Sequence, residues 1–303
     1  MYIFDAHMHI GGYGTPDPKG LTEKLEYAGV SGANLLSIDP EIPGFTYEER
    51  MDNLFAWVKG YEDRLFPVAW LHPFEDNILD KVRDCARRGV YGFKFIPSNF
   101  RVGDEQPMAV FRLIEELGFP ILFHSGILYD FSPSSDLNRP SNWESFVNCG
   151  NLRFSLAHCS HPWYDEGLLV LGKFLWLEQQ VEKTIRTGTG TYATHPWVQA
   201  HIARENGTAE SCCPQMYMDT SRGAQKIYRR DLFRKLCSYY PDAEHIMFGT
   251  DLYTENYDPE ITRSWLQEEN ALLDEFGASA RFRENMYQNN FFRFMGIKNP
   301  YTR

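Results

Sequence analysis

Short apolar runs alternate along this chain with longer stretches in which apolar residues recur at helical spacing. This alternation predicts parallel strands connected by helices, in a sheet that is buried on both faces. The predicted strands are residues 3–6, 34–38, 66–71, 91–96, 121–123, 153–157, 216–218 and 245–248. The predicted helices are residues 21–28, 47–61, 77–88, 108–117, 224–239 and 260–276. Eight strand units favour an α/β fold closed into a (β/α)8 TIM barrel over an open, doubly wound sheet.

The length of the chain fits one barrel domain. A closed barrel of this kind needs about 250 residues, and the chain has 303. Residues 130–149, which are rich in Pro, Ser and Asn, are predicted to form a loop over one mouth of the barrel. Residues 187–214 precede the seventh strand and are predicted to be an insertion. We therefore expect residues 1–303 to form a single barrel with C-terminal helices.

Charge and composition narrow the expected partners. The net charge of −11 argues against nucleic acid and against an anionic membrane surface, because both require a basic patch. No segment approaches the roughly 18 apolar residues of a membrane span, and the chain enters its first strand without a basic and apolar leader. Six cysteines without CxxC spacing are typical of reduced thiols. We expect a cytoplasmic protein with a small-molecule substrate; a homo-oligomer is possible.

Two histidines stand at the end of the first predicted strand. In an extended strand alternate side chains share a face, so His7 and His9 point the same way. Such a pair can bind a divalent transition metal, although two surface histidines or a hydrogen-bonded core pair would look the same. Further polar residues follow other apolar strands: His124, His158 and Asp251. A barrel assembles its site at these carboxyl ends and closes its first strand against its last, which favours a shared site over separate structural roles.

Other residues are candidates for substrate binding. Lys94 lies inside the fourth predicted strand, where it could contact a substrate anion, bridge two metal ions if carboxylated, or extend to the strand end as a structural lysine. Arg222 follows the seventh strand and could bind a carboxylate through two hydrogen bonds, or be an exposed charge. His161 and Trp163 would lie at the mouth, where aromatic groups suit a flat substrate.

The arrangement resembles the amidohydrolase superfamily, specifically its amidohydrolase-related branch of metal-dependent barrel enzymes. The resemblance covers most of the chain. It rests on these segments: Asp5-Ala6-His7-Met8-His9, His124, Ala157-His158-Cys159-Ser160-His161-Pro162-Trp163, Asp219-Thr220-Ser221, Phe248-Gly249-Thr250-Asp251 and residues 283–290. The chain departs from the family in having Ser160 where a glycine is usual, and in its long connection at 187–214.

The residues and the resemblance together imply one metal site. His7, His9, His124 and Asp251 would bind one divalent ion, zinc being the expected metal and manganese the alternative. Asp251 would act as the general base, and His158 would hydrogen-bond a polarised carbonyl or serve as a second acid or base. The first hypothesis is hydrolysis of an ester, lactone or amide in a small, carboxylated molecule. The alternatives are non-oxidative decarboxylation of an aromatic or unsaturated acid, and a barrel that binds metal or ligand without catalysis.

Overall fold

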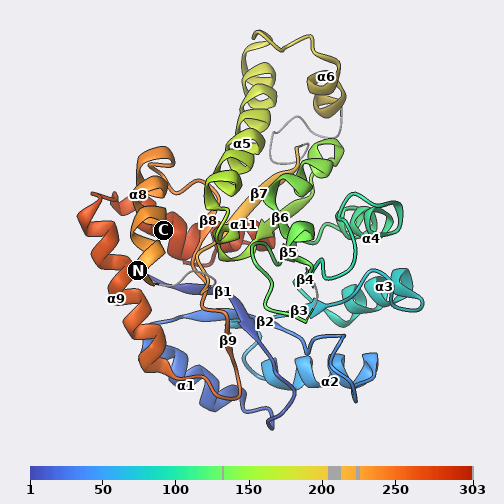
Figure 1. Ribbon diagram of the computed structural model, residues 1–303, viewed down its shortest axis with the longest axis vertical. Coiled ribbons are helices and arrows are strands. Elements are labelled where there is room, and N and C mark those ends of the chain that lie inside the picture. Colours follow the sequence, from blue (N-terminus) through green and yellow to red (C-terminus); the bar gives the residue numbers. More distant parts are fainter. Residues whose placement is uncertain (132, 204–212, 223–225, 302–303) are drawn as a thin grey trace.

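The computed structural model describes residues 1–131, 133–203, 213–222 and 226–301, and within them nine parallel strands form one curved sheet (Figure 1). The sheet order is β8-β7-β6-β5-β4-β3-β2-β1-β9. The strands are β1 (Phe4–His9), β2 (Gly32–Leu36), β3 (Leu65–Trp70), β4 (Gly92–Phe95), β5 (Ile121–Phe123), β6 (Arg153–Leu156), β7 (Gln215–Asp219), β8 (Ile246–Met247) and β9 (Leu252–Tyr253). All eight predicted strands are therefore present, and β9 is an addition that the sequence did not suggest.

The last strands return to the first. The backbone N–H of Ala6 donates to the carbonyl of Phe248 at 2.9 Å, directly after β8. The N–H of Asp251 then donates to the carbonyl of His7 at 2.7 Å, and β9 pairs with β1 in parallel. These contacts close the sheet on itself and confirm the predicted (β/α)8 barrel.

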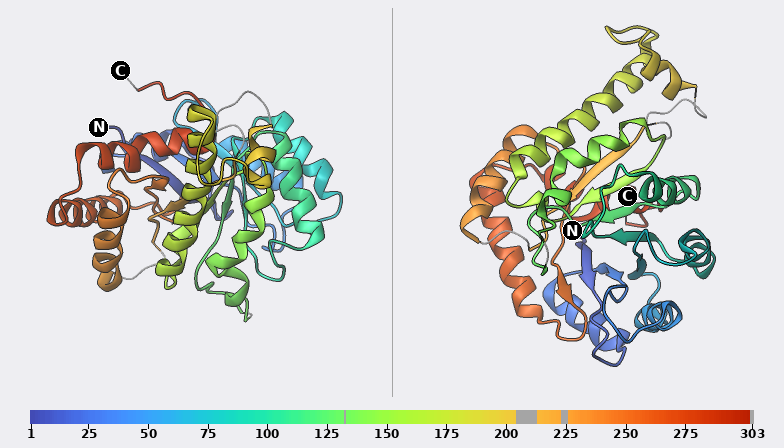
Figure 2. Two further views of the ribbon diagram at one scale, coloured as in Figure 1. Left: turned by 90° about the horizontal axis from the view of Figure 1, so that it is seen from above. Right: turned by 45° about the vertical axis from the view of Figure 1, so that its right-hand side comes forward.

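Helices cover the outer face of the sheet (Figures 1 and 2). They are α1 (Pro18–Ala28), α2 (Tyr47–Val58), α3 (Ile78–Arg88), α4 (Glu105–Glu116), α5 (Tyr164–Thr187), α6 (Pro196–Ile202), α8 (Lys226–Tyr239), α9 (Pro259–Glu275), α10 (Ala280–Glu284) and α11 (Asn290–Met295). Local sequence sets their starts: in α2, the Thr46 side chain accepts from the Glu49 backbone and the Glu49 side chain accepts in return. Among the described residues, no helix has the length and apolar character that crossing a bilayer requires.

Two segments interrupt the alternation of strands and helices, residues 130–149 and residues 187–214, and both contain short helices. Residues 130–149, which are predicted to form a loop over one mouth of the barrel, contain two short 3-10 helices, η1 (Ser135–Asn138) and η2 (Pro140–Asn148). The segment 187–214 follows α5, a 24-residue helix that the sequence analysis did not assign, and includes α6. Residues 204–212 of this segment lie outside the described residues. Figure 2 shows α5 and α6 projecting beyond the barrel.

One end of the barrel interior is filled by the C-terminal helix. Phe291 and Phe292 of α11 contact the ring of Phe4 at the start of β1, with centroid distances of 5.1 and 4.7 Å. Tyr217 of β7 stacks near Phe294 on the same helix. A π-helical turn, η5 (Asn285–Asn289), directly precedes α11 at this end. A short 3-10 turn, η3 (Ala157–Ser160), follows β6 at the opposite end. The amino ends of the strands are thus sealed, and an interior site can open only at their carboxyl ends.

Candidate metal centre

Three metal-competent atoms converge where β1 and the segment after β8 meet. Nε2 of His7 lies 3.0 Å from Nε2 of His9, because both side chains leave the same face of β1. Oδ1 of Asp251 lies 3.4 Å from Nε2 of His7 and 3.1 Å from Nε2 of His9. Both histidines are buried, whereas the Asp251 side chain keeps 31% of its surface exposed. The cluster is therefore deep on one side and open on the other.

Asp251 is held in place by the strand that carries the histidines. Asp5 of β1 is fully buried, and its carboxylate accepts from the backbone N–H of Thr250 at 3.0 Å and from the Thr250 hydroxyl at 2.5 Å. The same carboxylate accepts from the backbone N–H of His7 at 2.9 Å. Asp251 itself has a left-handed backbone, with φ of 61°, which carboxylate and amide residues tolerate better than most. Asp5 thus ties the two halves of the cluster together.

The other ring nitrogen of His7 is turned toward the end of β7. Nδ1 of His7 lies 3.3 Å from Oδ2 of Asp219 and 3.2 Å from the Ser221 hydroxyl. Asp219 is fully buried, and the neighbouring His7 and His158 lower the pKa of its carboxyl well below the usual range despite its burial. An ionised carboxylate can only accept, so Nδ1 of His7 carries the hydrogen and Nε2 is left with a lone pair. That lone pair points to His9 and Asp251.

His158 follows β6 in an unusual backbone turn. His158, Cys159 and Ser160 have φ values of 60°, 44° and 62°, so three successive non-glycine residues adopt the left-handed region. Each such residue costs about 1–2 kcal/mol and is tolerated when surrounding contacts impose it. Here Oδ1 of Asp219 accepts the backbone N–H of His158 at 3.1 Å, and the His158 ring lies 5.3 Å from the ring of His7. The φ of 62° at Ser160 is one that glycine adopts without strain, so this position fits the glycine that the resemblance implies.

His124 stands at the end of β5, on the far side of His158. Its ring centroid is 5.0 Å from that of His158, and its Nε2 is buried without a hydrogen-bond partner among the described residues. Burial and the neighbouring His158 and Lys94 lower the pKa of His124 well below its usual range. His124 is not among the residues whose ligand atoms group with those of His7 and His9. Its place as a further ligand therefore stays a prediction.

Lys94 points into the barrel beside this cluster. It is 1% exposed in the middle of β4, and its Nζ lies 3.4 Å from Nε2 of His7. Burial lowers the pKa of its ammonium to about 8, and the carboxylates of Asp251 and Asp219 oppose that shift. Burial together with Lys94 lowers the pKa of His7 to about 4. The pKa of Asp251 is held well below its usual range by His158 and His7 against the effect of burial. At neutral pH the cluster therefore combines the neutral imidazole of His7 with the ionised carboxylate of Asp251.

The donor set suits a divalent transition metal. Two ligand atoms at about 2.0–2.1 Å from zinc, seen at about 90–109°, lie about 2.9–3.4 Å apart. The three separations at His7, His9 and Asp251, from 3.0 to 3.4 Å, match that span. The lone pair of His7 and the Asp251 carboxylate both present negative charge density to the same point, which a cation would neutralise. The second group of metal-competent atoms, His7, His158 and Asp219, is bridged by Ser221 instead.

The predicted substrate-binding residues lie further out. His161 is half-buried and precedes a cis proline, and its ring lies tilted against that of Tyr228 with a centroid distance of 5.3 Å. Trp163 begins α5 and lies under the guanidinium of Arg139 at 4.7 Å. Arg222 is exposed, with its guanidinium 5.8 Å above the ring of Trp265. Their roles stay predictions, because no contact places them beside the three-atom cluster.

Sequence reasoning missed the residues that support the cluster. Asp219 and Ser221 were noticed as a strand ending but given no role, and Asp5 and Thr250 were likewise left without one. Trp70 and Tyr253 flank His9 with centroid distances of 5.2 and 5.5 Å, which adds aromatic walls on β3 and β9. These supporting residues could have been found from the sequence, because each polar residue lies in or close to a strand that contributes to the site.

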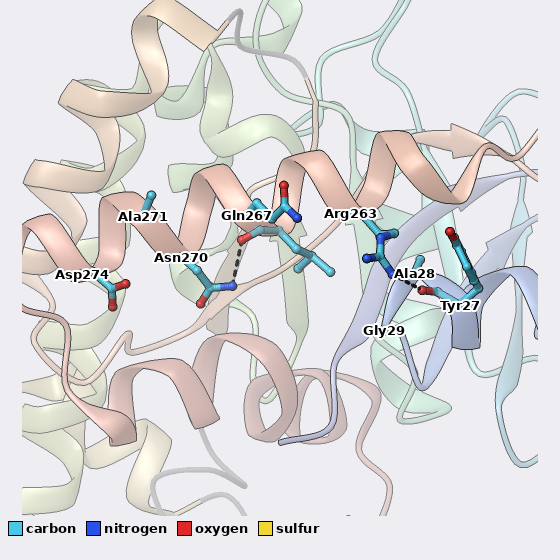
Figure 3. Close-up of a pocket in the computed structure, with 9 residues that line it drawn as sticks. Tyr27, Ala28, Gly29, Arg263, Gln267, Asn270, Ala271 and Asp274 are labelled. Carbon is cyan, nitrogen blue, oxygen red and sulfur yellow. Dashed lines mark hydrogen bonds between the residues drawn. The ribbon is translucent and has the colours of Figure 1, made fainter.

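A separate groove of about 470 Å³ lies on the outer helix layer, between the end of α1 and α9 (Figure 3). Arg263 crosses it and donates to the carbonyl of Tyr27 at 3.0 Å. Asn270 donates to the carbonyl of Leu266 within α9. None of the residues lining this groove belongs to the metal-competent groups, so it is not an extension of the cluster.

Comparison with known proteins identifies the family and supports the fold. The sequence matches the amidohydrolase family over residues 5–294, nearly the whole chain, so the protein belongs to that family. A comparison with curated proteins found no match.

Among solved structures, 2,6-dihydroxybenzoate decarboxylase from Rhizobium has a TM-score of 0.58 at 13% identity, covering 98% of this chain and 99% of that one. Dihydroorotase from Campylobacter jejuni has a TM-score of 0.54 at 13% identity, covering 98% and 84%. A D-hydantoinase has a TM-score of 0.58 at 8% identity, covering 96% and 70%. At these identities the structural likenesses support the fold alone.

Proposed function

We propose that this member of the amidohydrolase family is a metal-dependent hydrolase that cleaves an ester, lactone or amide bond in a small, carboxylated molecule. The observation that carries the proposal is the convergence of Nε2 of His7, Nε2 of His9 and Oδ1 of Asp251 within 3.0–3.4 Å at the open end of the barrel. Family membership supports an enzyme of this class, although the family includes more than one reaction type.

The proposed chemistry divides between the ion and the side chains. His7, His9 and Asp251, with His124 as a further ligand, would hold a divalent ion, which would supply Lewis acidity and would lower the pKa of bound water from ~15.7 toward ~7. Asp251 is ionised and partly exposed, so it can accept a proton and return it to the leaving group. Lys94 places a positive charge next to the cluster, where it can attract a substrate carboxylate, and Arg222 is the second candidate for that contact.

The first test measures metal content. Elemental analysis of protein dialysed against zinc should give about one ion per chain. His7→Ala and His9→Ala should lower this value, because each removes one of the converging nitrogens. His72→Ala is the matched control, since His72 contacts Asn99 at 3.0 Å and is not part of a metal-competent group. Unchanged stoichiometry in both β1 variants would remove them as ligands.

The second test measures the reaction. Zinc-loaded protein is incubated with a panel of lactones, carboxylate esters and cyclic amides, and with hydroxybenzoates. Hydrolysis that is lost in His7→Ala would support the proposal. Release of carbon dioxide from hydroxybenzoates without hydrolysis of any panel member would replace it with a decarboxylase.

A further inference from the structure

The hydrogen bonds around Ser221 fix where two histidine protons lie. The Ser221 hydroxyl contacts Nδ1 of His158 at 2.8 Å, Nδ1 of His7 at 3.2 Å, and Oδ1 of Asp219 at the shortest of the three distances. A hydroxyl has one hydrogen to donate and two lone pairs that accept. Only one of these three contacts can therefore use the Ser221 hydrogen.

That hydrogen belongs to the contact with Asp219. Oδ1 of Asp219 makes only acceptor contacts, so its contact with the hydroxyl oxygen would be repulsive unless Ser221 donated to it. Oδ1 of Asp219 also accepts the backbone N–H groups of Ser221 at 3.0 Å and of His158 at 3.1 Å. It acts purely as an acceptor in all of them. The hydroxyl oxygen must then accept from Nδ1 of His158.

We infer that Ser221 is a positioning residue, which holds the proton of His158 on Nδ1 and thereby leaves Nε2 of His158 as a hydrogen-bond acceptor. Nε2 has no hydrogen-bond partner among the described residues, and His158 keeps 7% of its surface exposed. The inference deepens the proposed function, on which it rests for the identity of the reaction. His158 has two candidate roles, donating a hydrogen bond to a polarised carbonyl and acting as an acid or base. With its hydrogen on Nδ1, the neutral ring cannot donate to a carbonyl oxygen from Nε2. The substrate or solvent group that meets Nε2 must instead be a donor, either O–H or N–H.

The surrounding structure makes this arrangement specific. Asp219 binds both the backbone of His158 and, through Ser221, its ring, so one carboxylate orients the whole residue. His7 is held by the same pair of side chains through its own Nδ1. Asp219 and Ser221 therefore set the direction of both lone pairs, that of His7 into the cluster and that of His158 away from Ser221.

The test reads the tautomer directly by NMR. Protein labelled with ¹⁵N-histidine is examined by long-range ¹H–¹⁵N correlation at about pH 8, where a histidine ring is neutral, and His158 is assigned by comparison with His158→Gln. The wild-type ring should carry its hydrogen on Nδ1. In Ser221→Ala the acceptor is lost, and the Nε2–H form, which a free histidine side chain prefers, should become the major form. A wild-type His158 with hydrogen on Nε2, or an unchanged tautomer in Ser221→Ala, would overturn the inference.

Two variants serve as controls. Ser37→Ala removes another buried hydroxyl at a strand end, one that accepts from the backbone of Trp70, and should leave the His158 signals unchanged. Ser221→Cys keeps the volume of the side chain with a weaker hydrogen-bonding group, and should give a smaller shift even if Ser221→Ala fails to fold. Spectra are recorded before and after addition of zinc. A wild-type protein that binds no zinc but carries the hydrogen of His158 on Nδ1 would count against the proposed function alone, and a wild-type protein that binds zinc but carries that hydrogen on Nε2 would count against the inference alone.

Discussion

The two ends of the barrel interior differ in what they bury: packed aromatic rings at the amino ends of the strands, and a cluster of imidazoles and carboxylates at the carboxyl ends. At the amino ends of the strands, rings from β1 and α11 pack on one another, as Phe4 does against Phe291 and Phe292. Nδ1 of the partly buried His245 in this region donates to the carbonyl of Met216 at 2.9 Å. At the carboxyl ends, Nδ1 of His9 and Nε2 of His124 are buried without a partner among the described residues.

This difference separates the groups that stabilise the fold from those that are available for chemistry. Burying an unpaired polar group costs about 1–3 kcal/mol, which folding alone does not favour. The unpaired nitrogens lie next to the converging lone pairs of the metal cluster, and the strained turn at His158 lies there as well. The apolar end can offset these costs because it buries several large rings. Changes at the two ends should therefore have different consequences.

The largest effect is expected at the carboxyl end, on activity. Asp251→Asn removes the charge and the proton acceptor while keeping the shape, and asparagine tolerates the left-handed backbone at this position. Turnover of whichever panel substrate is active should fall by about 10²–10⁴-fold, the usual contribution of a general base. The midpoint of thermal unfolding should change little. Asp258→Asn, the same change at the start of α9, should leave turnover unchanged because asparagine caps a helix as well as aspartate. Full activity in Asp251→Asn would refute the assigned role.

The next effect is expected at the amino end, on stability. Phe292→Ala removes a ring that is 3% exposed and packs edge-on against Phe4 at 4.7 Å. The free energy of unfolding in urea should fall by about 3–5 kcal/mol, the usual cost of emptying a buried phenylalanine site. Zinc content per folded chain should not change, since no ligand atom is affected. A selective loss of zinc would show that the two ends are coupled more strongly than the comparison implies.

The fold was largely predictable because its signal is local. A strand buried on both faces requires an apolar run, so each of the eight main strands was visible in the sequence, β5 with the same bounds. The short strand β9 was not, because Leu252 and Tyr253 are too few to show any periodicity. The helix α5 was missed as well. Its buried residues do recur at helical spacing, from Leu171 through Phe174 and Leu177 to Val181, so the signal was present in the sequence.

The cluster was predictable only in its outline. Polar residues at strand ends indicated where His7, His9 and Asp251 would meet, since parallel strands bring their carboxyl ends together. The partners of those residues depend on strand register and on the turn after each strand. Ser221 reaches His158 only because the left-handed turn brings that ring back over β7, and nothing in the residues 157–160 themselves specifies such a turn. Asp5 could have been noticed, since it shares a face with His7 and His9.

The pH dependence of stability offers the finest test of the comparison. Burial lowers the pKa of His245 to about 4, against an ordinary value of 6.5, so the folded protein keeps this ring neutral while the unfolded chain takes up a proton. Between about pH 4 and 6.5 the unfolded state binds more protons, and stability must rise with pH across that window and then level off. The contribution of this one residue is about 3 kcal/mol from the size of the shift.

His245→Asn keeps a donor for the Met216 carbonyl and tolerates the left-handed backbone at this position, but does not titrate. Urea unfolding of metal-free protein at several pH values should therefore show a shallower rise in His245→Asn than in wild type. Equal slopes in the two proteins would mean that the histidines of the carboxyl end, whose pKa values are also lowered, account for the whole dependence, and that the amino end is indifferent to the charge of His245.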